Sequence, residues 1–181
     1  MIVFVFLALG YTTVIVLGLL WFYDTFWGGE DFATSEHAIQ KISEIVSAKK
    51  SDGLLYDLGS SRGHVVFSLL KRVPNLQTVG IDNSYLRVWS ARLLSFFYDG
   101  NPIFKKGDFF NTDISRADFV YLYVPRELLP TLALKLKKEL KPGAQIITYR
   151  ITFSDWKPEQ VFLVDSKDPE KENVYVYSSG R

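Results

Sequence analysis

The chain contains no cysteine, has almost no net charge, and carries no charged side chain over its first 23 residues. Without cysteine the protein has neither disulfide bonds nor thiolate chemistry. A formal net charge of +1 over 181 residues lacks the surplus of Lys and Arg that binding to nucleic-acid phosphates requires. We therefore expect no nucleic-acid partner, and we predict no metal site.

The uncharged stretch, Met1–Tyr23, is apolar throughout. As a helix rising ~1.5 Å per residue it reaches roughly 30 Å, the thickness of the hydrocarbon core of a bilayer. A secretory signal would need Lys or Arg before the apolar run and a small-x-small cleavage site after it, and neither is present. A buried core helix is the third interpretation, but a uniformly apolar helix of this length is unusual inside a small domain.

We predict that residues 1–23 are a single transmembrane anchor in the lipid bilayer and that residues 24–181 form one domain. Three aromatic residues are typical of the belt found at a membrane surface: Trp21, Tyr23 and Trp27. The basic residues that follow the anchor favour the cytosolic, or matrix-equivalent, side for the domain: Lys41, Lys49 and Lys50.

One stretch organises the rest of the chain, Leu54–Phe67. It opens with an apolar run, passes Asp57 and two glycines four positions apart, Gly59 and Gly63, and resumes with helical periodicity. This pattern predicts a buried strand that turns sharply into a helix. Bare backbone and a helix N-terminus at such a turn favour a bound ligand, so we interpret the turn as a cofactor-binding elbow.

Apolar runs and helical patterns alternate along the remaining sequence. They predict an α/β fold, a doubly wound and mostly parallel sheet of seven strands that ends in an antiparallel hairpin. The predicted strands are 54–58, 77–82, a third that starts at 103–104 and is closed by Gly107, 118–124, 144–149, 161–164 and 174–177. The predicted helices begin at Thr34 or Ser35, after Gly63, at Ser84 and at Leu128.

Two of these helices carry further expectations. The helix that runs from Ser84 through Tyr98 places four large residues in one helical register: Leu86, Trp89, Leu93 and Phe97. The helix from Leu128 to Leu140 and the residue after it carry lysines that are most simply a solvated face: Lys135, Lys137, Lys138 and Lys141.

Ligands of doubly wound sheets bind beyond the carboxyl ends of the strands. Four polar groups follow successive predicted strands, and we expect them to meet in one crevice: Asp57, Asp82, Asp108 and Tyr123. Asp82 comes 23 residues after Gly59, where nucleotide-binding folds place an acid for ribose hydroxyls. Asp108 is interpreted either as an acceptor for an adenine amino group, with Phe109 over the ring, or as a simple turn residue.

Two nucleotide-binding motifs do not match the elbow. The dehydrogenase pattern G-x-G-x-x-G requires a glycine where this loop has Ser61, and no Gly-Lys-Ser/Thr of a phosphate-binding loop follows. The combination of Asp57-Leu-Gly59, Asp82, Gly107-Asp108 and a terminal hairpin instead resembles the seven-stranded, Rossmann-like S-adenosylmethionine-dependent methyltransferases.

A narrower resemblance uses more of the chain. The apolar leader, Phe32-Ala-Thr-Ser35 and Tyr56-Asp-Leu-Gly-Ser60 are similar to segments of the small membrane-anchored protein-lysine methyltransferases, the family of the ATP synthase c-subunit lysine methyltransferase. Leu122-Tyr-Val-Pro125 and Tyr149-Arg-Ile-Thr-Phe153 resemble its later segments. Such families usually read Asp-Leu-Gly-Ser-Gly-Asp/Glu-Gly, whereas this chain has Ser61 and Arg62 in place of the glycine and the acid.

The resemblance implies S-adenosylmethionine as the cofactor and a membrane protein as the substrate, methylated on a lysine near the bilayer. Tyr123 is the residue that we expect to orient the acceptor amine. The residues expected to bind the cofactor are Thr34, Ser35, Asp57, Gly59, Ser60, Ser61, Gly63, Asp82, Asn83, Asp108 and Phe109. Two alternatives stay open: a lipid-like or quinone-like small molecule as acceptor, and a catalytically weak, membrane-anchored binding homologue. The sequence does not indicate the oligomeric state.

Overall fold

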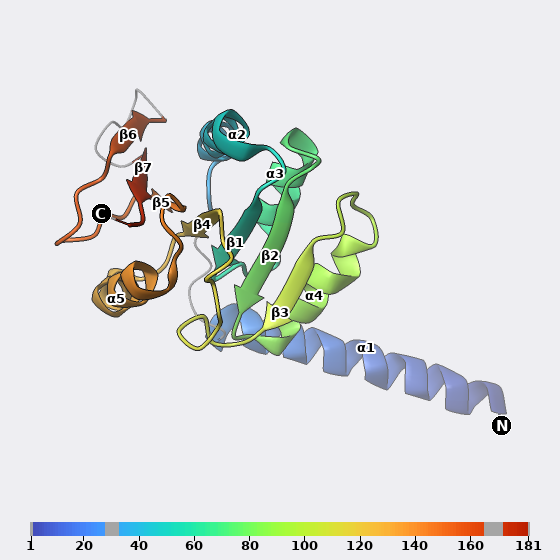
Figure 1. Ribbon diagram of the computed structural model, residues 1–181. Helices are drawn as coiled ribbons and strands as arrows, with labels where there is room; N and C mark the ends of the chain where they lie inside the picture. Colours follow the sequence, from blue (N-terminus) through green and yellow to red (C-terminus); the bar gives the residue numbers. More distant parts are fainter. Residues whose placement is uncertain (1, 28–32, 165–171, 181) are drawn as a thin grey trace. The chain divides into compact units, whose positions relative to one another are not determined.

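The computed structural model describes residues 2–27, 33–164 and 172–180. Within that part of the chain, seven strands form one sheet in the order β3-β2-β1-β4-β5-β7-β6 (Figure 1). Strands β1 to β5 are parallel to one another, whereas β7 runs antiparallel to both of its neighbours. The strands are β1 (Leu54–Leu58), β2 (Gln77–Asp82), β3 (Ile103–Lys106), β4 (Phe119–Leu122), β5 (Gln145–Tyr149), β6 (Gln160–Leu163) and β7 (Asn173–Ser178).

Helices cover both faces of this sheet. One apolar core lies under α2, α3 and α4, and a second lies under α5 on the opposite face. Helix α1 belongs to a separate unit, residues 1–31, and the sheet with its other helices forms the unit 32–181. The helices are α1 (Ile2–Trp27), α2 (Glu36–Lys50), α3 (His64–Arg72), α4 (Tyr85–Ser95), the short 3₁₀ helix η1 (Arg126–Leu128) and α5 (Leu129–Glu139).

The predicted fold class is confirmed, and most element boundaries agree within a few residues. Strand β3 begins at Ile103 and ends at Lys106, just before Gly107 as predicted, and its backbone pairs with β2 as far as Asp82. Strand β4 ends at Leu122 rather than at Val124, just before Pro125 and η1. Helix α4 ends at Ser95, and tighter turns carry the chain on to Tyr98.

The structure shows which way one predicted register faces and corrects one expectation about a surface. On α4 the buried side chains are Arg87, Val88 and Ala91, so the register that holds Trp89 and Leu93 is the outer face. On α5, Lys135 is buried rather than solvated, and its ammonium pairs with Glu139 at 2.5 Å. A lysine can be buried in this way because its charge is paired within the same helix.

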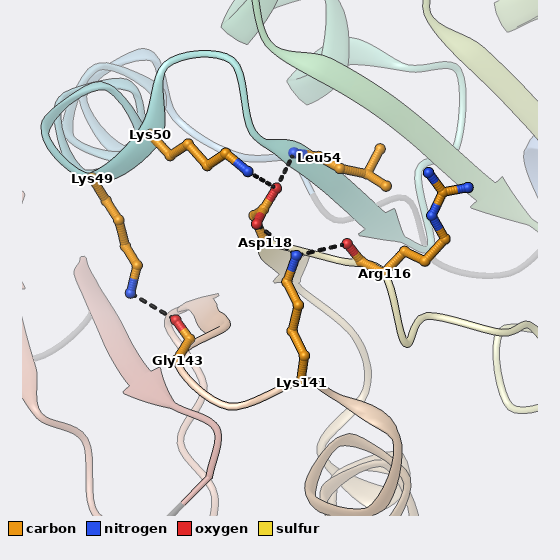
Figure 2. Close-up of polar contacts among 7 residues, drawn as sticks. All are labelled: Lys49, Lys50, Leu54, Arg116, Asp118, Lys141 and Gly143. Atoms are coloured by element: carbon orange, nitrogen blue, oxygen red, sulfur yellow. Dashed lines mark hydrogen bonds and ion pairs between the residues drawn. The ribbon is translucent and has the colours of Figure 1, made fainter.

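Asp118 connects four segments at the amino-terminal edge of the strands (Figure 2). Its carboxylate accepts hydrogen bonds from Lys141 Nζ at 2.7 Å, the Leu54 amide at 2.9 Å and Lys50 Nζ at 3.0 Å. Nearby, Lys49 Nζ donates to the carbonyl oxygen of Gly143 at 2.7 Å. These contacts fix α2, β1, β4 and the turn after α5, and they leave the opposite, carboxyl edge of the sheet available for a site.

Candidate functional site

The elbow between β1 and α3 is built on left-handed backbone. Gly59 has φ +90° and Gly63 has φ +84°, conformations that glycine adopts without steric cost. Between them Ser61 has φ +47°, which is unusual for a residue with a Cβ atom. A Cβ atom at Gly63 would lie 2.5 Å from the ring of Phe104. The close approach of this loop to β3 therefore requires glycine at position 63.

Backbone and side-chain hydrogen bonds attach the elbow to the end of β2. The amides of Gly59 and Ser60 both donate to the carbonyl oxygen of Ile81, at 2.8 and 2.9 Å. The Ser61 amide donates to Asp82 Oδ2 at 2.9 Å, and the Ser84 amide donates to Asp82 Oδ1 at 2.8 Å. Asp82 thus joins the elbow to the beginning of α4.

Gly80 on β2 contributes to the same junction. A Cβ atom there would lie 2.6 Å from the ring of Phe104 and 2.7 Å from Ser60 Oγ. The Ser60 hydroxyl is buried and has no hydrogen-bond partner among the described residues. A buried polar group of this kind is typical of a position that a ligand satisfies.

Asp57, one residue before the carboxyl end of β1, has a strongly perturbed carboxyl group. Burial raises its pKa to about 8, and the negative charge of Asp82 adds to the effect. Asp57 is therefore a buried acid that is poised between its neutral and charged forms near physiological pH. Such acids are common at functional sites, and a neighbouring cation would favour the charged form.

The carboxylate of Asp108 forms hydrogen bonds within its own turn. Its carboxylate accepts hydrogen bonds from the Phe110 amide and from Asn111 Nδ2, both at 2.9 Å. Phe109 is half-buried and its ring lies 4.8 Å from that of Phe110. The Gly107 amide donates to the carbonyl oxygen of Asp82 at 2.9 Å, so this turn lies beside the end of β2.

The beginning of α2 reaches the same edge of the sheet. Ser35 is the N-cap of this helix, since its hydroxyl accepts a hydrogen bond from the Ala38 amide at 3.2 Å. Thr34 is buried and its hydroxyl lies 2.6 Å from the Tyr121 hydroxyl on β4. Asn83, by contrast, is exposed between β2 and α4.

A cluster of polar aromatic residues lies at the ends of β4 and β5. The ring of Tyr123, after β4, meets the ring of Tyr149 edge-on at 5.0 Å. Glu172, just before β7, accepts hydrogen bonds from Arg150 Nη2 at 2.7 Å and from the Tyr149 hydroxyl at 2.9 Å. Arg150 has φ +59°, so the backbone holds it in a strained conformation.

The same cluster is connected to α2 and to Tyr123. Ser35 Oγ lies 3.5 Å from Glu172 Oε2, and the guanidinium of Arg150 also interacts with the Tyr123 hydroxyl. Burial raises the pKa of Tyr149 above its usual value. The hydrogen bond with Ser35 lowers this pKa, and the hydrogen bond with Glu172 raises it. The Tyr149 hydroxyl is thus a neutral donor at physiological pH.

Sequence reasoning identified Tyr123 but missed the residues around it. Tyr121 and Tyr149 are buried on the sheet face that α2 covers. The one sequence signal for this position is the period-two alternation of side chains along β4 and β5. Glu172 is the last residue of a charged segment, 166–172, that sequence reasoning interprets only as a loop joining the last two strands. Residues 166–171 of this segment lie outside the described residues, as do residues 28–31 and Phe32. Gly80 was also missed, although glycine inside a strand often marks a close approach.

Comparisons with known proteins agree with this geometry. Residues 57–160 match the family model described as the ANTKMT methyltransferase domain. A protein-lysine N-methyltransferase from Saccharolobus islandicus is 28% identical over 149 residues, 81% of this chain and 91% of that protein. The lysine N-methyltransferase of the ATP synthase c-subunit from Xenopus laevis is 28% identical over 113 residues, but the chain spans only about half of its length (49%).

A solved structure is also similar. The RNA methyltransferase from Salinibacter ruber, in complex with S-adenosyl-L-homocysteine, superposes with a TM-score of 0.72 and 25% identity over 81% of this chain and 93% of that one. The residues of the elbow fit the cofactor that such enzymes use, because Gly59 leaves exposed backbone without a side chain and buried Asp57 and Ser60 offer polar groups. The chain belongs to the family of the ANTKMT methyltransferase domain, and it is a class I methyltransferase that depends on S-adenosylmethionine.

Proposed function

We propose that this enzyme methylates the side-chain amine of a protein lysine. The observation that carries the proposal is the cluster of Tyr123, Tyr149, Arg150 and Glu172 at the edge of the sheet that also bears the elbow. The relatives from Saccharolobus islandicus and Xenopus laevis support the substrate class, since both are lysine N-methyltransferases.

The residues predicted to hold the cofactor keep that role in the proposal. Asp57 and Ser60 offer buried polar groups, and Asp82 lies where ribose hydroxyls bind in related folds. Thr34 and Ser35 approach from α2, and Asn83, Asp108 and Phe109 border the other side. When bound, S-adenosylmethionine supplies a methyl group that its sulfonium already activates, so the protein's main task is alignment.

The acceptor lysine has to lose its proton before it can act as a nucleophile. Desolvation at the acceptor position and the positive charge of a sulfonium beside it would lower the pKa of an incoming ammonium, whereas the charge of Arg150 is balanced by Glu172. The Tyr123 hydroxyl orients the resulting amine through a hydrogen bond. Glu172 fixes Arg150 and Tyr149 in place without presenting an unpaired carboxylate to the substrate.

We further propose that residues 1–23 anchor the enzyme in a membrane by a single span, with residues 24–181 as the methyltransferase domain on the cytosolic or matrix-equivalent side. Within α1, Ile2–Leu19 is long and apolar enough to cross a bilayer, a property that signal sequences share. Trp21 lies in the helix, whereas the side chains of Tyr23 and Trp27 lie outside the described part of the chain. An anchor would confine enzyme and membrane-protein substrate to one plane and raise their effective concentration.

The test is methyl transfer from labelled S-adenosylmethionine to native membranes by the full chain. The expected result is label in a protein band, with N-methyllysine after hydrolysis. Tyr123→Phe should lower kcat by about 10- to 100-fold through loss of orientation, and Glu159→Gln, a glutamate next to β6, is the matched control. Label found only in the organic extract or in RNA would contradict the proposal.

A further inference from the structure

Helix α4 presents an apolar face that no described residue of the unit 32–181 covers. Val88 and Ala91 pack inward against the sheet, whereas the opposite face is exposed to an unusual degree. Phe96 is 84% exposed, Phe97 80% and Trp89 57%. Tyr85 and Leu93 extend this surface, which we call the α4 face: Tyr85, Trp89, Leu93, Phe96 and Phe97. In Figure 1, α4 lies next to β3, the edge strand of the sheet.

An exposed apolar surface of this kind usually marks an interaction site. Its surroundings are basic. From Asn83 to Gly107 the exposed charged residues are three basic ones, Arg92, Lys105 and Lys106, and a single acid, Asp99. Lys105 and Lys106 are exposed on β3, and Lys106 Nζ lies 4.5 Å from the centre of the Tyr85 ring. The partner that fits combines an apolar interior with negative charge at its surface.

A bilayer with anionic lipids has these two properties. Trp and Tyr concentrate at membrane interfaces, Phe and Leu enter the acyl boundary, and Lys extends toward the headgroups. A second copy of the chain fits less well, because a two-fold contact would bring together two surfaces that both carry an excess of basic residues. We propose that the α4 face lies in the headgroup region of an anionic bilayer and is a second membrane contact besides α1.

This proposal rests on the membrane anchor of the proposed function, which brings the domain to the bilayer. It adds to the anchor a statement of which face of the domain contacts the bilayer. Helix α4 begins directly after Asp82 and Ser84, so its Tyr85 end lies at the edge of the sheet that carries the candidate site. A bilayer against the α4 face would therefore lie beside the entrance for a lysine at the membrane surface.

The absence of cysteine makes a clean test available, since any introduced cysteine is the single labelling site. Leu93→Cys and Phe97→Cys are prepared in the full chain, labelled with a nitroxide and reconstituted in nanodiscs with or without anionic lipid. Leu134→Cys is the matched control, because Leu134 is 72% exposed on α5, across the sheet from α4. The measurement is the collision rate of the nitroxide with oxygen, which enters lipid, and with a water-soluble nickel complex.

With anionic lipid, the ratio of oxygen to nickel collisions at positions 93 and 97 should exceed that at position 134 by about threefold or more. The combined change Lys105→Glu and Lys106→Glu should reduce this difference. Equal ratios at all three positions, with the protein still bound to the nanodiscs, would overturn the α4 contact and leave the anchor intact. Protein that does not associate with nanodiscs would refute both, and spin–spin broadening independent of lipid would indicate a second copy instead.

Discussion

The amide of Ser61 and the carboxylate of Asp82 are joined by a hydrogen bond of 2.9 Å, across 21 positions of sequence. This bond connects the elbow after β1 with the end of β2, and the other carboxylate oxygen of Asp82 binds the first turn of α4. One side chain therefore connects the elbow after β1 to the segment between β2 and α4. Its position also leaves lone pairs on both oxygens for hydroxyl donors.

Removing that carboxylate should loosen the elbow. Asp82→Ala leaves the amides of Ser61 and Ser84 without their acceptor, which should cost about 1–3 kcal/mol in the free energy of unfolding. Cofactor affinity should fall at least tenfold in the same variant. Thermal unfolding and calorimetric titration measure the two effects. Asp99→Ala, an exposed acid beyond α4, is the control and should change neither; equal behaviour of the two variants would refute the assigned role.

Ser61 stores backbone strain that glycine would relieve. With φ +47° its Cβ atom is held in a region that costs about 1–2 kcal/mol for residues other than glycine. Because glycine loses more entropy on folding, Ser61→Gly should stabilise the protein by a net amount of about 0.5–1 kcal/mol. Chemical denaturation gives this value directly. Ser60→Gly, which removes a buried hydroxyl side chain at ordinary backbone angles, is expected not to stabilise, and similar gains in both variants would contradict the explanation.

Asp57 should oppose folding more strongly as the pH rises. Its folded-state pKa is about 8 because of burial and the charge of Asp82, whereas an unfolded aspartate titrates near 3.9. Between these values the native state holds one more proton than the unfolded state, so the free energy of unfolding falls from about pH 4 to about pH 8. Asp57→Asn removes this dependence and should be more stable than the wild type by up to about 5 kcal/mol at pH 8, and by about 1–2 kcal/mol at pH 5.

The same Asp57→Asn variant should bind S-adenosylmethionine at least tenfold more weakly, because a buried charge that serves the ligand is lost. Denaturation curves at pH 5, 6.5 and 8 and a titration at pH 8 test both parts. A pH-independent difference in stability, or unchanged affinity, would show that Asp57 is only structural.

Asp118 should have the opposite pH dependence. Partial burial raises its pKa, but hydrogen bonds from Lys141, the Leu54 amide and Lys50 outweigh this and hold the pKa at about 2. A lowered pKa stabilises the fold above the unfolded value near 3.9, and this contribution is lost as the pH falls toward 2. Asp118→Asn should therefore lose about 2 kcal/mol at neutral pH and show a weaker acid transition. Asp52→Asn, an exposed neighbour before β1, is the control, and an equal acid transition in all three proteins would exclude this role.

Much of the candidate site followed from local rules. Parallel strands bring their carboxyl ends to one edge, so Asp57, Asp82 and Asp108 had to approach one another once the alternation of strands and helices was recognised. The left-handed turns at Gly59 and Gly63 required glycine, and Ser35 had the chemistry of an N-cap. These features depend on short stretches of chain, and the sequence of such a stretch encodes them.

Contacts between distant segments were beyond sequence reasoning. Glu172 meets Tyr149 and Arg150 only because β7 inserts antiparallel beside β5, and no local pattern specifies that pairing. Likewise, the periodicity of α4 shows which residues share a face, but only packing decides whether Val88 or Trp89 points inward. By itself the sequence determined the fold class, the elbow and its acids, since these arise from backbone geometry and strand order. The tertiary structure decided which side chains surround Tyr123 and which face of α4 is exposed, because both depend on where non-neighbouring elements pack.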